Sequence, residues 1–138
     1  RMRVGNQMPE FSLPSLAGET VASASLAGEP TVLNFWATWC QPCLKEIPEL
    51  IELADQGVRV VGIALDQEGE VAVRPFVEKQ GMDYTILLGN QEVFQRMGGL
   101  AIPYTLVLDA SQKVISIHRG AASRADLESD LARIEPAA

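Results

Sequence analysis

The chain has few of the residues that most binding sites require. Its 138 residues include two cysteines and one histidine, and 6% are aromatic. A structural zinc site usually takes four Cys or His ligands, so one chain cannot supply it. The 11 Lys and Arg are scattered and outnumbered by 18 Asp and Glu, which argues against nucleic-acid binding. No apolar run approaches the roughly 20 residues of a membrane span. We expect no metal or other cofactor, no nucleic-acid partner and no spanning helix.

The beginning of the sequence leaves the cellular compartment open. Residues 1–5 contain no apolar region of a secretory signal peptide. A cytosolic protein and a protein whose leader has been removed both fit. The composition is 47% hydrophobic and 21% charged, which is typical of a globular chain that buries its own core. We expect a monomer with one domain over 1–138, made of an N-terminal extension (1–30) and a core (31–138).

Strand and helix patterns alternate from residue 31 onward. Apolar, β-branched runs predict strands, and apolar residues at helical spacing predict helices. The expected strands are 31–37, 59–65, 84–88, 104–108 and 113–118, and the expected helices are 40–54, 70–80, 91–97 and 123–134. Residues 11–13 and 19–21 are expected to pair as a hairpin. This order predicts an α/β fold of three layers, with a mixed central sheet, helices on both faces and an N-terminal hairpin extension.

The two cysteines lie at the start of a predicted helix, in the sequence Cys40-Gln41-Pro42-Cys43. Residues three apart on a helix have Cα atoms about 5 Å apart, which is within the usual range for a disulfide. A disulfide that closes such a short loop stabilises the fold by only about 1.9 kcal/mol, so it is a weak brace. A reversible dithiol/disulfide is therefore the leading interpretation.

The positions of the cysteines suggest different roles for the two sulfurs. Cys40 stands where unpaired N–H groups and the positive end of the helix dipole stabilise an anion. We therefore expect Cys40 to be the attacking thiolate. Cys43 lies one turn inside the helix, where burial would keep it protonated, and is expected to resolve the mixed disulfide. Pro42 suits the first helical turn because the N–H that it lacks would have no partner there.

The segment Asn34–Cys43, followed by Lys45-Glu46-Ile47-Pro48, resembles the thioredoxin superfamily. It is most similar to the branch that includes TlpA, ResA and CcmG/DsbE, and residues 5–13 and 99–107 are similar to that branch as well. The resemblance implies a thioredoxin-like fold and thiol–disulfide oxidoreductase activity. It also implies a cis Ile102–Pro103 peptide bond packed against the dithiol, beside which an extended substrate segment docks by strand addition.

The resemblance further implies a location and partners. Members of this branch are typically periplasmic or otherwise extracytoplasmic, and many are anchored in the membrane. Many reduce protein disulfides, for example in apocytochrome c during cytochrome c maturation, and receive electrons from a membrane thiol donor. The expected partners are thus protein thiols and disulfides.

Acidic and aromatic residues near the cysteines are candidate supporting residues. In the family, an acidic residue near the dithiol can assist proton transfer, and we favour Glu68 over Asp66 for this position. A solvated loop with acids near a helix start is the alternative interpretation. Trp39 is expected to be a partly exposed wall of the docking surface, and Trp36 to lie in the core.

The remaining polar residues receive simpler interpretations. Lys45 and Glu46 are expected on the helix surface. His118, the one histidine, is expected to be an ordinary surface or edge residue rather than a metal ligand.

Two other functions are weighed against the oxidoreductase. A peroxiredoxin-like thiol peroxidase needs Thr-x-x-Cys after a proline, whereas this chain has Thr38 two residues before Cys40 and Asn34 where the proline would stand. A copper-binding module of the Sco type needs a wider cysteine spacing and a suitably placed histidine.

Overall fold

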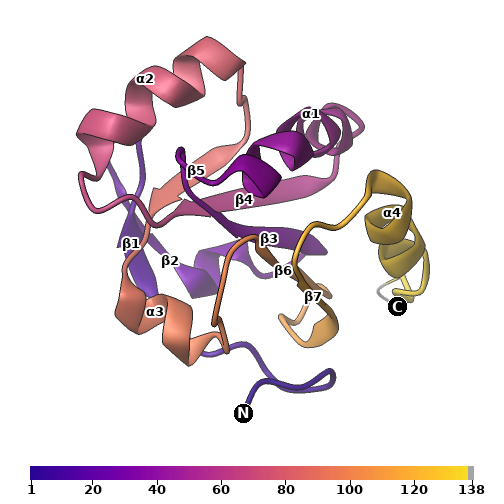
Figure 1. Ribbon diagram of the computed structural model, residues 1–138. Coiled ribbons are helices and arrows are strands. Elements are labelled where there is room, and N and C mark those ends of the chain that lie inside the picture. The colour runs from indigo at the N-terminus through magenta and orange to yellow at the C-terminus, as the bar shows by residue number, and fades with distance from the viewer. Residues whose placement is uncertain (137–138) are drawn as a thin grey trace.

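The computed structural model describes residues 1–136, and its centre is a mixed β-sheet (Figure 1). The strand order is β5-β4-β3-β6-β7. Neighbours β3, β4 and β5 run parallel, while β6 is antiparallel to both β3 and β7. The strands of this sheet are β3 (Thr31–Trp36), β4 (Arg59–Ala64), β5 (Thr85–Leu88), β6 (Tyr104–Leu108) and β7 (Val114–Arg119).

Helices cover both faces of the sheet. The helices are α1 (Gln41–Asp55), α2 (Glu70–Gln80), α3 (Gln91–Arg96) and α4 (Arg124–Ala132). In Figure 1, α1 and α2 lie above the strands and α3 lies below them. The apolar residues of α1, α2 and α4 pack on one face, and those of α3 pack on the other. These are the three layers that the alternating sequence predicts.

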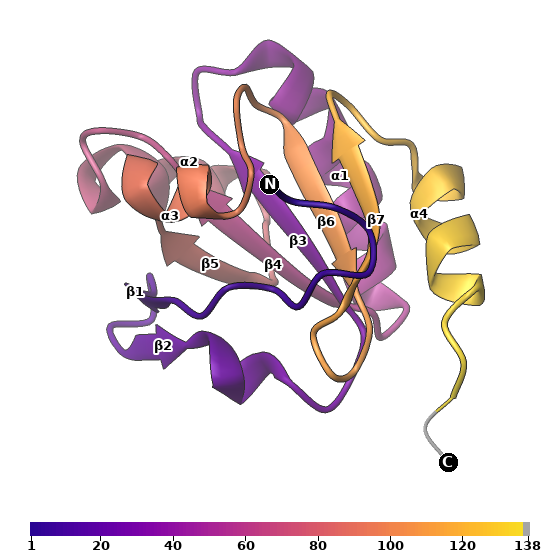
Figure 2. The same ribbon diagram turned by 90° about the horizontal axis from the view of Figure 1, so that it is seen from below.

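The N-terminal extension covers the α3 face of the sheet. It contains an antiparallel hairpin of β1 (Ser12–Pro14) and β2 (Thr20–Ala22), followed by a 3-10 helix, η1 (Ser23–Leu26). Figure 2 shows the chain before β1 crossing this side of the sheet. Met8 and Phe11 bury their side chains there in the same cluster as Phe94.

Alternation along β3 explains how one strand serves both layers. Successive side chains of a strand point to opposite faces. Leu33 and Phe35 enter the cluster under α3, whereas Val32 and Trp36 enter the clusters under α1. By the same rule Asn34 points toward α1, and its amide contacts a side chain of that helix.

The expected elements are confirmed, with ends that differ by one or two residues. The first strand of the core ends at Trp36 rather than at residue 37, and the last helix ends at Ala132 rather than at 134. The hairpin is shifted by one residue on each side. Among residues 1–136, no helix is long and apolar enough to cross a membrane.

Candidate active site

The two cysteines form a disulfide at the start of α1. Strand β3 ends at Trp36, a short turn follows, and Cys40 is the N-cap of the helix with extended backbone dihedrals. The Cα atoms of Cys40 and Cys43 are 5.2 Å apart. The backbone N–H of Cys43 donates to Sγ of Cys40 over 3.3 Å. The Cys40 sulfur therefore accepts an N–H group that has no partner within the helix, at a place where a negative charge is stabilised.

Burial distinguishes the two sulfurs. In the disulfide form Cys40 is 5% exposed and Cys43 is 1% exposed. Both belong to the apolar cluster that contains Trp36 and Ile47. Cys40 is thus the more accessible cysteine, although only a small part of it reaches the surface. Pro42 lies between them on the exposed side of the first turn.

The Ile102–Pro103 peptide bond is cis, as the resemblance implied. It lies directly before β6, the strand that pairs with β3. Pro103 is buried, and the half-buried Ile102 packs against the cluster that holds both cysteines. The structure therefore brings a segment about 60 residues further along the chain to the dithiol.

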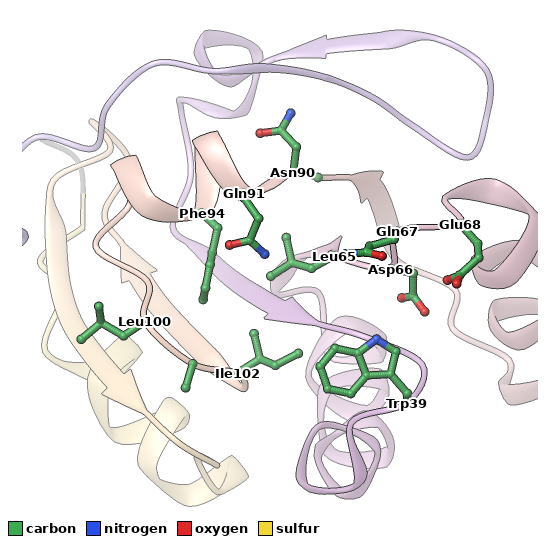
Figure 3. Close-up of a pocket in the computed structure, with 12 residues that line it drawn as sticks. Trp39, Leu65, Asp66, Gln67, Glu68, Asn90, Gln91, Phe94, Leu100 and Ile102 are labelled. Atoms are coloured by element: carbon green, nitrogen blue, oxygen red, sulfur yellow. The ribbon is translucent and has the colours of Figure 1, made fainter.

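A pocket of about 820 Å³ opens next to the turn before Cys40, because Trp39 is one of the residues that line it (Figure 3). Trp39 and Ile102 lie on one of its sides, and the ring of Phe94 and the side chain of Leu65 lie further in. Trp39 is 67% exposed, which fits the expected wall of a docking surface. The pocket is mostly apolar, and its acidic side chains gather at the end near Trp39.

The structure places the two acidic candidates, Asp66 and Glu68, differently. Both line the pocket. Glu68 is exposed at its rim. Asp66 is buried, and its carboxylate accepts hydrogen bonds from the backbone N–H of Thr38 at 3.1 Å and from the hydroxyl of Thr38 at 2.6 Å.

The expectation that Glu46 lies on the helix surface is wrong. Glu46 is 3% exposed and belongs to the inner face of α1, together with Cys43, Ile47 and Leu50. Its Oε2 accepts the backbone N–H of Ala122 at 2.6 Å, and its Oε1 lies 3.4 Å from Nδ2 of Asn34. A buried carboxyl group needs such donors, and here they come from two other elements of the fold.

Burial changes the acidity of Glu46. Desolvation raises its pKa from an ordinary 4.5 to about 7. The hydrogen bonds from Ala122 and Asn34 and the nearby His118 oppose this rise, and the neighbouring Glu49 adds to it. The carboxyl group can therefore take up and release a proton near neutral pH.

Helical spacing is the sequence signal that points to Glu46. Residues three apart on a helix lie on the same face with Cβ atoms about 5–6 Å apart, so Glu46 follows Cys43 into the interior. The spacing alone does not reveal a donor such as the Ala122 N–H, which comes from 76 residues further along the chain. A glutamate that follows a lysine near a helix start is more often solvated than buried, which explains the error.

The other predicted residues lie as expected. Trp36 is in the core, and Lys45 is exposed on α1. His118 lies on the edge strand β7, where its Nε2 is 2.5 Å from Oδ2 of Asp130 on α4.

These features define a class: proteins of thioredoxin fold with a CxxC disulfide at a helix start and a cis-proline directly before the strand that pairs with β3. A family profile for Redoxin matches residues 3–133, and the chain belongs to this family. The resemblance to the ResA and DsbE branch is confirmed, and the protein is a thiol–disulfide oxidoreductase of this type.

Individual relatives agree with this assignment. The chain is 30% identical to the thiol-disulfide oxidoreductase ResA of Bacillus thuringiensis subsp. konkukian over 141 residues, which cover 99% of this chain and 81% of the relative. The crystal structure of a thiol:disulfide interchange protein from Chlorobium tepidum TLS is 32% identical, with a TM-score of 0.79 and coverage of 96% and 97%. A secreted disulfide oxidoreductase of Mycobacterium tuberculosis is 28% identical, with a TM-score of 0.76 and coverage of 90% and 96%.

Proposed function

We propose that the protein reduces disulfides of other proteins outside the cytoplasm, with Cys40 as nucleophile and Cys43 as resolving thiol. The observation that carries the proposal is the Cys40–Cys43 pair at the start of α1, with the buried Glu46 on the same helix face. The disulfide closes a loop of only four residues, so it can form and break with little movement of the surrounding fold. Its chemistry is therefore local to the first turn of α1.

The exchange proceeds in two steps that conserve electrons and protons. The Cys40 thiolate attacks one sulfur of a substrate disulfide, so a Cys40–substrate bond forms and the substrate S–S bond breaks. The released substrate thiolate takes a proton. Cys43 then loses its proton and attacks Sγ of Cys40, which closes the protein disulfide and releases the second substrate thiolate, and this thiolate also takes a proton. The substrate gains two electrons and two protons, and a thiol donor later returns the protein to its dithiol form.

Glu46 is the group that we propose as acceptor of the Cys43 proton. It follows Cys43 by three residues on the buried face of α1, and its raised pKa of about 7 matches the task. Exposed Glu68 remains a prediction as a supporting residue at the rim of the pocket.

The pocket beside Trp39 is the surface on which we propose that substrates dock. The backbone before Pro103 would pair with an extended substrate segment, and Trp39 and Ile102 would contact its side chains. The mostly apolar lining favours a segment that carries apolar residues next to its cysteine.

Location and partners are proposed from the relatives. The 28% identical Mycobacterium tuberculosis oxidoreductase is described as secreted, which supports a periplasmic or other extracytoplasmic location. Similarity to ResA supports a role in cytochrome c maturation, with apocytochrome c as substrate and a membrane thiol donor as partner. A membrane tether and a monomeric state are part of the same proposal.

The redox potential of the Cys40–Cys43 pair tests the direction of the reaction. Equilibration with glutathione or dithiothreitol buffers should give a value well below about −200 mV, as a reductant requires. A value near −120 mV, typical of a strong oxidant, would contradict the reductase proposal.

Trapping of the mixed disulfide tests which sulfur attacks the substrate. Cys43→Ser should accumulate a mixed disulfide with an oxidised protein substrate such as insulin, and Cys40→Ser should not.

A further inference from the structure

The turn that carries Trp39 and Cys40 is joined to the end of β4 by one side chain. The last backbone bond in this part of the sheet runs from the N–H of Leu65 to the carbonyl of Trp36, at 2.9 Å. The next residue, Asp66, bonds to the turn through its side-chain carboxylate. It accepts both the backbone N–H and the hydroxyl of Thr38, so a side chain continues the connection where the strands have ended.

These bonds are strong by their geometry and surroundings. The Thr38 hydroxyl donates to Oδ2 of Asp66 over 2.6 Å, which is the length of a charge-assisted hydrogen bond. The Thr38 N–H lies 3.1 Å from Oδ1 and 3.4 Å from Oδ2. Asp66 is only 6% exposed, so water competes little for its carboxylate.

The position of the Cys40 sulfur depends on this turn. The N–H of Cys40 donates to the carbonyl of Ala37 over 3.2 Å, which closes the turn around Thr38. Cys40 Sγ in turn accepts the N–H of Cys43. A displacement of Thr38 would therefore move the sulfur away from the N–H groups that stabilise its thiolate. It would also move Trp39, which Figure 3 shows in the same part of the pocket as Asp66.

We propose that Asp66 is a positioning residue of the reaction: through Thr38 it holds the turn that keeps the Cys40 thiolate on the helix start and Trp39 at the pocket. This rests on the proposed function and deepens it, because it assigns Asp66 a part in nucleophile activation. Asp66 itself does not touch the reacting sulfurs.

The test removes the Thr38 hydroxyl without changing the shape of the side chain. In the reduced protein, iodoacetamide alkylation of Cys40 is followed across pH by peptide mass mapping for the wild type, Thr38→Val and Thr38→Ser. Thr38→Val should move the midpoint of the profile to higher pH and slow alkylation at pH 7 by about twofold to tenfold, the range expected for one hydrogen bond. Thr38→Ser keeps the hydroxyl and should restore the wild-type profile.

Two further comparisons separate positioning from other effects. Thr85→Val makes the same change at an exposed position of β5 and should leave the profile unchanged. In an Asp66→Ala background, Thr38→Val should have no further effect, because the partner of the hydroxyl is already gone.

Two outcomes would overturn the proposal. One is a wild-type alkylation profile for Thr38→Val together with a lower free energy of unfolding, which would make the bonds purely structural. The other is an equal effect of Thr38→Val with and without Asp66. Failure of the reductase proposal would look different: the wild type would not reduce insulin, while the alkylation profiles would still respond to Thr38.

Discussion

Glu46 is almost completely buried, although its side chain is ionisable. None of its described hydrogen-bond partners carries a positive charge. Its carboxylate oxygens are met by the neutral donors of Ala122 and Asn34 rather than by Lys or Arg. Neutral donors only partly compensate for the loss of water, so the pKa rises to about 7. A salt bridge would have lowered the pKa and removed the group from the neutral range.

The raised pKa of Glu46 predicts a pH dependence of stability in the disulfide form. Between pH 4.5 and about 7 the carboxyl group ionises in the unfolded chain but stays protonated in the folded chain. The folded state then binds more protons, so the free energy of unfolding falls as pH rises through this window, by about 3 kcal/mol at most, and levels off above it.

Urea denaturation of the oxidised wild type and of Glu46→Gln between pH 5 and 8 measures this contribution. Glutamine keeps a carbonyl oxygen for the Ala122 N–H but does not titrate. The difference in unfolding free energy between the two proteins should therefore shift in favour of Glu46→Gln as pH rises. Parallel curves across the whole range would contradict the assignment.

At the residue scale, local sequence was sufficient for some side chains and insufficient for others. The Cys-Gln-Pro-Cys spacing fixed the disulfide geometry, since a helix start places both sulfurs within reach. Glu46 and Asp66 could not be placed in this way. Their partners are Ala122 and Thr38, residues that only the packed fold brings to them.

Helix α4 is attached to α1 by a row of acidic residues. Glu46, Glu49 and Glu52 are spaced three apart along α1. They accept, in order, the N–H of Ala122, the N–H of Arg124 at 2.9 Å and the guanidinium of Arg124. The start of α4 therefore helps to hold the helix that carries the dithiol.

The N-cap of α4 gives a prediction for this element. The hydroxyl of Ser123 accepts the N–H of Asp126 over 3.0 Å, and Ser123→Ala should lower the free energy of unfolding by about 1 kcal/mol. Ser129→Ala is the matched control, because it makes the same change at an exposed position within α4 and should have little effect. Equal losses in thermal or urea denaturation would show that the cap contributes nothing.

Elements were predictable from the sequence where periodicity was strong. The buried runs that became β3, β4 and β6 were placed within a residue of their ends. Helix ends were less certain, since α4 stops at Ala132 although apolar Ile134 continues the pattern. The cis bond before Pro103 follows only from family resemblance, because a trans bond is the default for any sequence.

The fold as a whole does not rely on its disulfide. Apolar clusters fill both faces of the central sheet, and they include fully buried side chains such as Phe35, Leu53 and Leu106. A disulfide across four residues restricts the unfolded chain only slightly. Both redox states can therefore share one architecture, as repeated cycling requires.

Reduction should accordingly cost little stability. In urea denaturation with and without dithiothreitol, the reduced protein should lose no more than about 2 kcal/mol of unfolding free energy and keep its far-UV circular dichroism. A Cys40→Ser/Cys43→Ser double variant should match the reduced wild type and should not respond to dithiothreitol. Loss of the folded signal on reduction would mean that the disulfide is a brace.

The bond from Ala122 to Glu46 has one more consequence. Its donor is a main-chain amide, which every amino acid except proline carries at position 122. Point mutations that would delete a side-chain partner therefore leave this donor in place. Most substitutions at position 122 should therefore keep the hydrogen bond to Glu46.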